Sequence, residues 1–368
     1  MKNTLRHLVA KQRGGFSVRW RTDFVQQSKR TERLFLEVGV GIPTSVITIL
    51  LCEKKQFSLS WIKEIITTEL VEDITKWPGH NKFQQLNRFK SVYFYEEDSF
   101  PIVGDSIFDG LIVKLKGNQT YRVFDNKGEE LNEKMSNRLC NSFANKTYRF
   151  DVFKSSSATS LPILVWPEQA NRNRVLAVAR ASNLMRDVTD TPALSLGPAD
   201  LALVAIEIAE EFKANTITKI EGVEQLMKRN FPQVAAVGLA AENSRQPILV
   251  DIKFNPPNCV VDLESIPEVV IIGKGVCFDT GGLNIKGSSG MRGMKKDKAG
   301  AAQAIALAVL CLSVFTPFPY RLRLLLPCVE NSIGSNALRP GDIIRARNGK
   351  TTEISNTVSY FNSFNIYF

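Results

Sequence analysis

A chain of 368 residues is long enough for two domains that each bury a core of their own. Hydrophobic residues make up 44% of the chain and charged residues 23%, as in ordinary globular proteins, and no apolar run approaches the roughly 20 residues of a membrane helix. The net charge is +10, but the basic residues are not interleaved with a recognisable aromatic surface, which argues against a nucleic-acid-binding protein.

Residues 1–40 form a basic lead-in. Residues 1–22 hold six Lys or Arg residues and no acidic residue, which fits either a solvated tail or a mitochondrial transit segment but not a secretory signal. The six cysteines, at positions 52, 140, 259, 277, 311 and 328, include no CxxC pair. This scatter favours reduced thiols, so we expect a cytoplasmic protein, with the mitochondrial matrix as the alternative.

Residues 41–153 predict a small N-terminal α/β domain. The expected strands are VITILLC at 46–52, SVYFYE at 91–96 and GLIVKLK at 110–116, and the expected helix is SLSWIKEIITTELVEDITK at 58–76. No catalytic constellation occurs in this stretch, so we expect the domain to serve packing or assembly. Residues 154–169, which contain several Ser and two Pro residues, predict a linker.

Residues 170–357 alternate more regularly. The expected helices are NRNRVLAVARASNLMRDV at 171–188, GPADLALVAIEIAEEF at 197–212 and AGAAQAIALAVLCL at 299–312, and the expected strands are ILVDIKF at 248–254, EVVIIG at 268–273 and RLRLLLPC at 321–328. Pro198 and Asp200 are helix-start signals. Strands this apolar, alternating with helices, predict a mostly parallel sheet covered on both faces. The fold class is therefore α/β.

Histidine is scarce, and its scarcity limits the chemistry of the C-terminal half. The chain has two histidines, His7 and His80, and both lie in the N-terminal half. A Ser-His-Asp triad and an HExxH zinc site are therefore excluded from the C-terminal half. Carboxylate and lysine side chains remain as the groups that could act there.

The stretch at 268–310 concentrates such groups in a glycine-rich loop after a buried strand, where open α/β sheets bind their ligands. Four residues stand out there: Lys274, Asp279, Lys286 and Asp297. The loop fits neither the dinucleotide nor the P-loop glycine pattern. Each charged residue could simply be solvated, and Asp297 could cap the following helix. Gly281-Gly282 directly after Asp279 indicate a tight backbone around that carboxylate. A metal or acid–base site is the functional alternative.

Three motifs carry a resemblance to a known family. GKGVCFDTGGLNIK followed by MKKDKAGAA resembles the signature of the leucyl (cytosol) aminopeptidases, the M17 metallopeptidases. RDVTDTPALSLGPADL upstream and LPCVENSIGSNALRPGDIIRARNGKTTEISNT downstream are similar to the same family, so that the resemblance covers about 170–357. Asp190 and Leu194 stand where Asn is usual, and Lys298 replaces an apolar residue. The resemblance implies a small N-terminal α/β domain and a partial catalytic α/β domain at 170–357.

The resemblance also implies roles for single residues. Lys274 would ligate one metal through a neutral amine, which burial and an adjacent cation favour. Asp279 would bridge two metals, and Asp297 would bind one of them. Lys286 would polarise the substrate carbonyl, and Met294 would line the pocket for the first side chain. Two divalent ions, Zn or Mn, about 3.5–4 Å apart would activate water. The implied enzyme is a metal-dependent exopeptidase that releases N-terminal residues from peptides and assembles as a homo-hexamer.

The stretch after Asn356-Thr357 departs from the family. The family continues with D-A-E-G-R, which supplies two further carboxylate ligands and an arginine, whereas Val358, Ser359 and Tyr360 follow here. Two of the four expected carboxylates remain, namely Asp279 and Asp297. We therefore expect this chain to bind at most one metal, weakly, and to have little or no peptidase activity.

Two accounts explain residues 358–368, VSYFNSFNIYF. The chain could be a non-catalytic binding or assembly subunit of the same family. Alternatively, the stretch is an aberrant tail from translated intron, because the common donor sequence GTAAGT reads Val-Ser in frame and the residues that follow favour AT-rich codons. Sequencing the transcript across this junction decides between them. A spliced message that still encodes VSYF would exclude the intron account.

Overall fold

The computed structural model describes residues 35–36, 46–53, 91–95, 112, 115–124, 130–154, 160–241, 243–257, 262–315 and 317–354. Residues 29–180 and residues 181–368 belong to different compact units, and the division falls inside helix α6 (Arg172–Asp190). From the sequence we expect the boundary earlier, at a linker over 154–169. The expected lead-in at 1–40, apart from residues 35–36, the helix at 58–76 and the tail at 358–368 lie outside the described residues.

The unit of residues 29–180 contains a parallel sheet. Its elements before α6 are β1 (Phe35–Leu36), β2 (Val46–Glu53), β3 (Ser91–Tyr95), β4 (Thr120–Phe124), α5 (Glu133–Thr147) and β5 (Ile163–Val165). The strand order is β1-β5-β4-β2-β3, and every pairing is parallel. The Asn132 side chain accepts a hydrogen bond from the Met135 amide and so caps α5. Phe35 stacks on Trp166 in the core, with ring centroids 4.0 Å apart.

Two sequence expectations differ from the structure of this unit. Ile112, Leu115 and Lys116, within the strand predicted at 110–116, are not in a strand. A turn satisfies their backbone, because the Leu115 amide donates to the Ile112 carbonyl and the Lys116 amide donates to the Tyr121 hydroxyl. The predicted linker at 154–169 contains β5, whose Leu164 is fully buried. The apolar run ILVW explains β5, because its side chains are removed from water when the strand joins the sheet.

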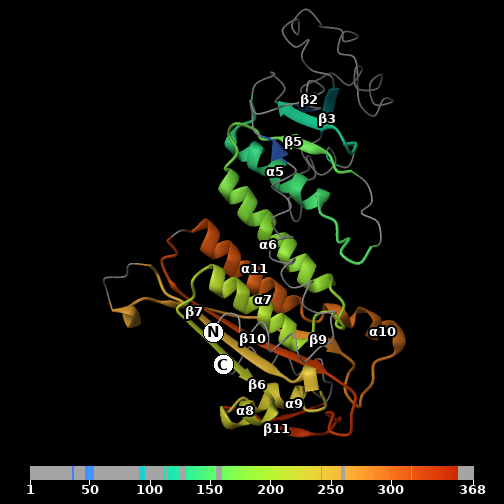
Figure 1. The fold of residues 1–368 in the computed structure, drawn as a ribbon, viewed down its shortest axis with the longest axis vertical. Helices are drawn as coiled ribbons and strands as arrows, with labels where there is room; N and C mark the ends of the chain where they lie inside the picture. The colour runs from blue at the N-terminus through green and yellow to red at the C-terminus, as the bar shows by residue number, and fades with distance from the viewer. Residues whose placement is uncertain are drawn as a thin grey trace, which may run out of the picture. The chain divides into compact units, whose positions relative to one another are not determined.

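The unit that contains residues 181–354 holds the region where the sequence places the chemistry (Figure 1). Its elements after α6 are α7 (Pro198–Glu211), β6 (Thr216–Glu221), α8 (Val223–Lys228), α9 (Pro232–Val237), η6 (Asn243–Arg245), β7 (Ile248–Phe254), η7 (Leu263–Ser265), β8 (Glu268–Ile272), β9 (Gly275–Asp279), α10 (Ser288–Arg292), η8 (Gly293–Lys296), α11 (Ala299–Val314), β10 (Arg321–Asn331), β11 (Ile343–Arg345) and β12 (Thr351–Glu353). The sheet order is β6-β7-β10-β8, and β9 also pairs with β10.

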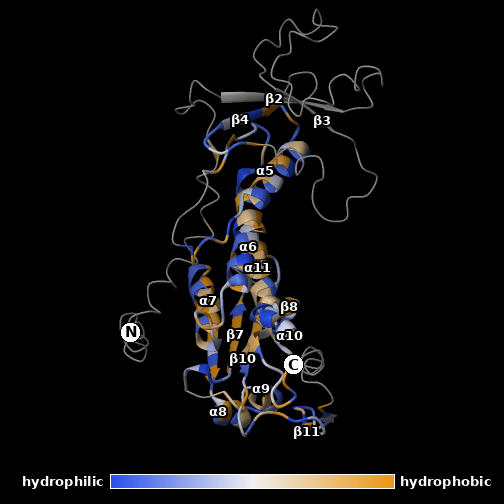
Figure 2. Ribbon diagram, turned by 90° about the vertical axis from the view of Figure 1, so that its right-hand side faces the viewer, coloured by the Kyte–Doolittle hydropathy of each residue, from blue (hydrophilic) through white to orange (hydrophobic). Residues whose placement is uncertain are grey.

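Both faces of this sheet are covered at its centre. Side chains alternate along a strand, so Ile248, Val250 and Ile252 of β7 pack with α7, α11 and the end of α6, whereas Leu249 packs with α8 and α9 on the other face. Figure 1 shows α7 and α11 lying side by side along the sheet. Figure 2 shows hydrophobic residues along β7 and β10, the strands against which these two helices pack. The core is therefore a buried sheet between two helical layers.

The α/β class is confirmed, and the strand directions refine it. The pairings of β10 with β8 and with β9 are parallel, whereas β6 with β7 and β7 with β10 are antiparallel. The second sheet is therefore mixed rather than mostly parallel. Strand β8 is also less buried than its apolar sequence suggests, since Val269 and Val270 are 40% and 44% exposed. The reason is position, because β10 is the only described strand that pairs with β8.

One helical run has the length and hydropathy of a membrane span. It covers residues 288–314, which include α10, η8 and α11. The C-terminal part of this run, α11, buries Ala301, Ile305 and Val309 against the sheet. A core helix of a soluble domain meets the same criterion, so the run is weak evidence for a membrane span.

Candidate metal centre

The site begins at an interruption between β8 and β9. The register of β8 with β10 continues into β9, since Ile272 pairs with Leu325 and Gly275 with Cys328. Lys274 therefore lies opposite Pro327, which has no N–H to donate and weakens the ladder at this point. The Lys274 carbonyl accepts a hydrogen bond from the Ala301 amide at the start of α11, 2.8 Å away. This contact ties the interrupted strand to the beginning of the helix.

Close approach of these two segments requires a glycine. A Cβ atom added at Gly300 would lie 3.0 Å from the Lys274 nitrogen and 3.1 Å from the Lys274 Cβ. A larger residue at position 300 would therefore push α11 away from Lys274. The small residues at the start of α11 thus set the position of Lys274.

Asp279 is the last residue of β9 and is almost fully buried, at 1% exposure. A bulge between Val329 and Asn331 of β10 places Asn331 opposite Asp279. The Asn331 Nδ2 donates to Asp279 Oδ1 at 2.7 Å, and the Gly281 amide donates to the same oxygen at 2.9 Å. These two donors fix the carboxylate and leave Oδ2 for a further partner.

The loop after β9 brings Lys286 back to Asp279. Gly281 and Gly282 both have positive φ angles, of 90° and 63°, which side chains other than glycine rarely adopt. The Lys286 amide then donates to the Thr280 carbonyl at 2.9 Å, which closes the loop. As a result, Lys286 Nζ lies 3.2 Å from Asp279 Oδ2. The two glycines after Asp279 therefore allow the tight loop that brings Lys286 close to the carboxylate.

Asp297 lies between η8 and α11, and its amide donates to the Met294 carbonyl. Its Oδ1 lies 2.7 Å from Lys274 Nζ. Its Oδ2 is buried and accepts no hydrogen bond from the described residues. Burial raises the pKa of Asp297, and the adjacent Asp279 acts in the same direction, whereas Lys274 and Lys286 lower it. Asp297 does not cap α11, whose N-cap is Lys298.

The structure thus brings Lys274, Asp279, Lys286 and Asp297 into one electrostatically coupled cluster. Met294 lies on η8 beside this cluster and is partly buried. A buried carboxylate oxygen without a hydrogen-bond donor is an unsatisfied anionic acceptor, which a divalent cation would satisfy. The cluster therefore offers one unsatisfied carboxylate oxygen, that of Asp297, to a divalent ion.

The described carboxylates fall short of a complete metal site. Among residues 35–354 as far as they are described, no three His, Cys, Asp or Glu side chains form a group that could hold a metal ion. Each of the two aspartates also has a lysine of its own, because Lys274 pairs with Asp297 and Lys286 pairs with Asp279. Positions 358 and 360 lie outside the described residues.

Two residues around the cluster have contacts that sequence reasoning did not anticipate. Asn331 donates a hydrogen bond to Asp279. The sequence feature that could have indicated this role is a polar residue at the end of an apolar strand. Lys298, noted in the sequence as a departure from the family, is fully buried, and its Nζ donates to the Thr191 carbonyl at 2.8 Å and to the Lys295 carbonyl. The pKa of Lys298 is lowered to about 8, chiefly by burial and to a lesser degree by Lys295, whereas Cys277 and Asp190 act in the opposite direction.

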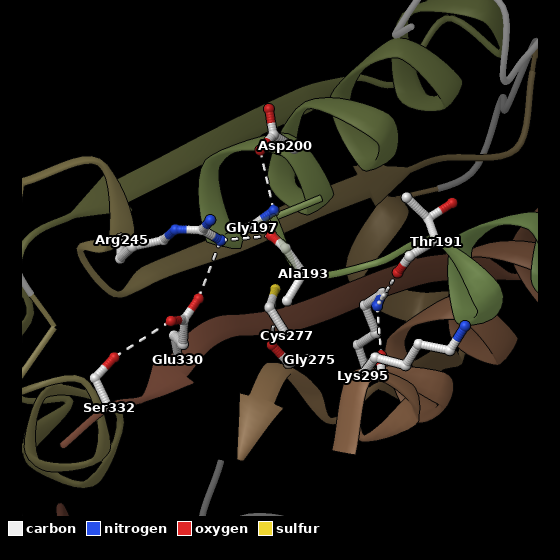
Figure 3. A network of polar contacts seen from close by, with 11 residues as sticks. Thr191, Ala193, Gly197, Asp200, Arg245, Gly275, Cys277, Lys295, Glu330 and Ser332 are labelled. Carbon is white, nitrogen blue, oxygen red and sulfur yellow. Dashed lines mark hydrogen bonds and ion pairs between the residues drawn. The ribbon is translucent and has the colours of Figure 1, made fainter. Parts of the chain in front are cut away.

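The loop after α6 is held at a second point by Arg245. Its Nη1 donates to the Ala193 carbonyl at 2.6 Å and to Glu330 Oε2 at 3.0 Å. Figure 3 shows Arg245 between Ala193 and Glu330. It also shows Thr191, on the same loop as Ala193, near Lys295 of η8. The segment that follows α6 is therefore connected both to β10 and to the segment before α11.

Comparisons with known proteins identify the family. Residues 183–359 match the catalytic domain of the cytosol aminopeptidase family. Peptidase B of Pectobacterium carotovorum is 37% identical over 174 residues, which are 47% of this chain and 38% of that protein. The matched part thus spans well under half of this curated relative.

Solved structures agree with this assignment. The cytosol aminopeptidase of Coxiella burnetii is 30% identical with a TM-score of 0.68, over 89% of this chain and 67% of that one. The bottromycin maturation enzyme BotP in complex with Mn is 24% identical with a TM-score of 0.65, over 86% of this chain and 66% of that one. The family is metal-dependent. From these matches we conclude that the chain belongs to the cytosol aminopeptidase family, the M17 metallopeptidases.

Proposed function

We propose that residues 181–354 carry part of a metal-dependent aminopeptidase site, in which Lys274, Asp279 and Asp297 hold one divalent ion. The observation that carries this proposal is the buried Asp297 Oδ2, which accepts no hydrogen bond from the described residues. The cluster offers hard oxygen ligands, which suit Mn, and a lysine amine that would suit Zn. The Mn complex of BotP makes Mn the first ion to test.

The roles of the protein groups follow from their contacts. A bound divalent ion would supply Lewis acidity and activate water at neutral pH. The Asn331 and Gly281 donors orient Asp279, so that its Oδ2 stays directed at the site. Lys286 lies at that oxygen and would donate to the carbonyl oxygen of a bound peptide as negative charge develops on it. Lys274 would leave Asp297 and act as a ligand in its neutral form.

The proposed substrates are peptides, from which the site would release N-terminal residues, with Met294 lining the pocket for the first side chain. The names of the relatives, peptidase B and cytosol aminopeptidase, support this substrate class. The name cytosol aminopeptidase supports a cytoplasmic location, whereas the mitochondrial alternative depends on the basic N-terminus outside the described residues. A homo-hexamer is the proposed assembly, and size-exclusion chromatography with light scattering tests it.

We further propose that this chain is impaired as a peptidase. Val358 and Tyr360 stand where the family pattern has an aspartate and a glutamate. Lys274 and Lys286 already neutralise the two aspartates, so a metal ion must displace an ammonium group. Hydrolysis of leucine-p-nitroanilide with Mn is the test, and we expect little or no turnover. A rate normal for the family would contradict this proposal.

The second candidate function is a non-catalytic binding or assembly subunit of the same family. The observation that favours it is the pair of lysine–aspartate contacts, which stabilise the cluster without any metal ion. A metal titration combined with the leucine-p-nitroanilide assay separates the two candidates. An enzyme shows turnover that depends on the metal, whereas a subunit of this kind assembles equally well after treatment with a chelator.

A further inference from the structure

The buried amine of Lys298 is the feature of this unit that the proposed chemistry does not use. Its side chain is fully buried at the N-cap position of α11. An ammonium group is costly to bury unless hydrogen bonds and opposite charge compensate for the lost hydration. Its Nζ donates to the Thr191 carbonyl, which follows the last turn of α6, and to the Lys295 carbonyl. Carbonyl oxygens at the end of a helix are favourable partners for a cation.

Two neighbouring lysines bind the same end of α6. Lys295 Nζ donates to the Asp190 carbonyl at 2.9 Å, and Lys296 Nζ lies 3.3 Å from Asp190 Oδ1. Three lysines of one short segment therefore contact Asp190 and Thr191. Figure 3 shows the Thr191 carbonyl and Lys295 on either side of this contact. The contacts differ in burial, since the Lys296 side chain is 58% exposed and Lys298 is fully buried.

Asp297 lies within this segment. Its neighbours Lys296 and Lys298 are both attached to the end of α6, one through a carboxylate and the other through a carbonyl. The contact of Lys298 with the Lys295 carbonyl also closes the turn that contains Asp297. The backbone of Asp297 is therefore restrained mainly by the buried contacts of Lys298, because solvent screens the exposed ion pair of Lys296.

We propose that Lys298 is a positioning residue that fastens the Asp297 segment to the end of α6 through the Thr191 carbonyl, and that the negative charge of the adjacent Asp190 favours the buried ammonium group. The inference rests on the proposed function, in which Asp297 is a metal ligand. It concerns the two residues at which this chain carries a charge where the family pattern has a neutral residue, Asp190 and Lys298. A buried cation on one segment and an anion on the other would keep Asp297 in place without adding a ligand.

The test uses the full chain and four variants. Lys298→Met keeps the length of the side chain and removes its charge, Asp190→Asn removes the negative charge next to Thr191, and the double variant removes both. Lys296→Met is the matched control, because it removes an exposed lysine from the same segment. Hydrogen exchange of residues 293–302 is measured against that of β7, and Mn affinity is measured by calorimetry.

We expect Lys298→Met to speed exchange at 293–302 by about tenfold or more, the value of a lost hydrogen bond to a charged group. Exchange in β7 should stay within about twofold of the parent chain. Mn affinity should fall about 10- to 100-fold, as for other groups that orient a metal ligand. Lys296→Met should change either quantity by less than about threefold. The effect of the double variant should be smaller than the product of the single effects.

Several outcomes would overturn the proposal. Unchanged exchange at 293–302 in Lys298→Met would show that the lysine does not fasten the segment. An equal rise in β7 would show a general loss of stability instead of a local role. If Lys298→Met does not fold, Asp190→Asn decides, because the proposal requires faster local exchange in that variant as well. A parent chain that binds no Mn would refute the proposed function, while the exchange data would still test the role of Lys298.

Discussion

The two units of this chain differ in what they bury. Among the described residues, the buried polar side chains of the unit at 29–180 are neutral hydroxyl groups: Thr120, Ser136, Ser142 and Thr147. The unit at 181–354 buries four charged side chains: Asp187, Asp200, Asp279 and Lys298. A buried charge costs several kcal/mol unless it is paired and hydrogen-bonded. Two of these four, Asp279 and Lys298, lie at or next to the candidate metal site, so the second unit carries buried charge there at a cost in stability, whereas the described core of the first unit buries no charged side chain.

The largest expected effect is a loss of stability in the unit at 29–180. Phe143 is fully buried and lies edge-on to Phe35. Phe143→Ala should lower the free energy of unfolding of the unit at 29–180 by about 3–5 kcal/mol, because it removes a ring and leaves a cavity. Urea denaturation measures this change. Mn affinity of the second unit should remain as in the parent chain, and a parallel loss of Mn binding would contradict the division of roles.

A second prediction concerns the buried negative charge of Asp279 in the unit at 181–354. Asp279→Asn keeps the shape of the side chain and an acceptor for the Gly281 amide, but it removes the negative charge. Mn affinity should fall by at least about a hundredfold, the upper end of what outer groups around a metal cost. Calorimetric titration measures the change. Asp251→Asn is the control because that aspartate lies in the middle of β7 and pairs with Arg323 instead of with a residue of the cluster.

A third prediction concerns the residue that orients Asp279. Asn331→Ala removes the 2.7 Å hydrogen bond to Asp279 Oδ1 without removing a proposed ligand. Mn affinity should fall about 10- to 100-fold, less than for Asp279→Asn. An Mn affinity equal to that of the parent chain would mean that the Gly281 amide alone is enough to hold the carboxylate.

The smallest expected effect is at a surface ion pair of the same sheet. Arg323 of β10 forms two hydrogen bonds with Asp251 of β7, at 2.9 and 2.7 Å, and both side chains are partly exposed. Arg323→Met should change the free energy of unfolding by no more than about 1 kcal/mol, because solvent screens such pairs. Thermal unfolding measures it. A loss as large as that of Phe143→Ala would remove the distinction between buried and exposed charge.

Much of the second unit could be predicted from its sequence. The apolar strands β7 and β10 and the helices α7 and α11 carry strong periodic or compositional signals, and the structure has them close to the predicted bounds. Strand directions could not be predicted, because an apolar run is the same in a parallel and an antiparallel pair. The strand predicted at 110–116 was wrong at the described residues 112, 115 and 116, because a hydrogen bond from the Lys116 amide to the Tyr121 hydroxyl replaces a ladder there.

The candidate site could also be predicted only in part from the sequence. Lys274, Asp279, Lys286 and Asp297 were recognisable as a cluster because glycines and a strand end surround them in the sequence. Their pairing, Lys274 with Asp297 and Lys286 with Asp279, could not be read from spacing. The contacts of Lys298 were equally hidden, since its partners lie 107 residues away in the chain at Thr191 and beside it at Lys295.

The number of Mn ions bound per chain tests the central claim most directly. The purified chain is titrated with Mn after removal of metal by a chelator, alongside an Asp279→Asn/Asp297→Asn variant. We predict no more than one ion per chain, weakly held, and none in the variant. Two tightly bound ions per chain, or binding that survives loss of both aspartates, would contradict this prediction.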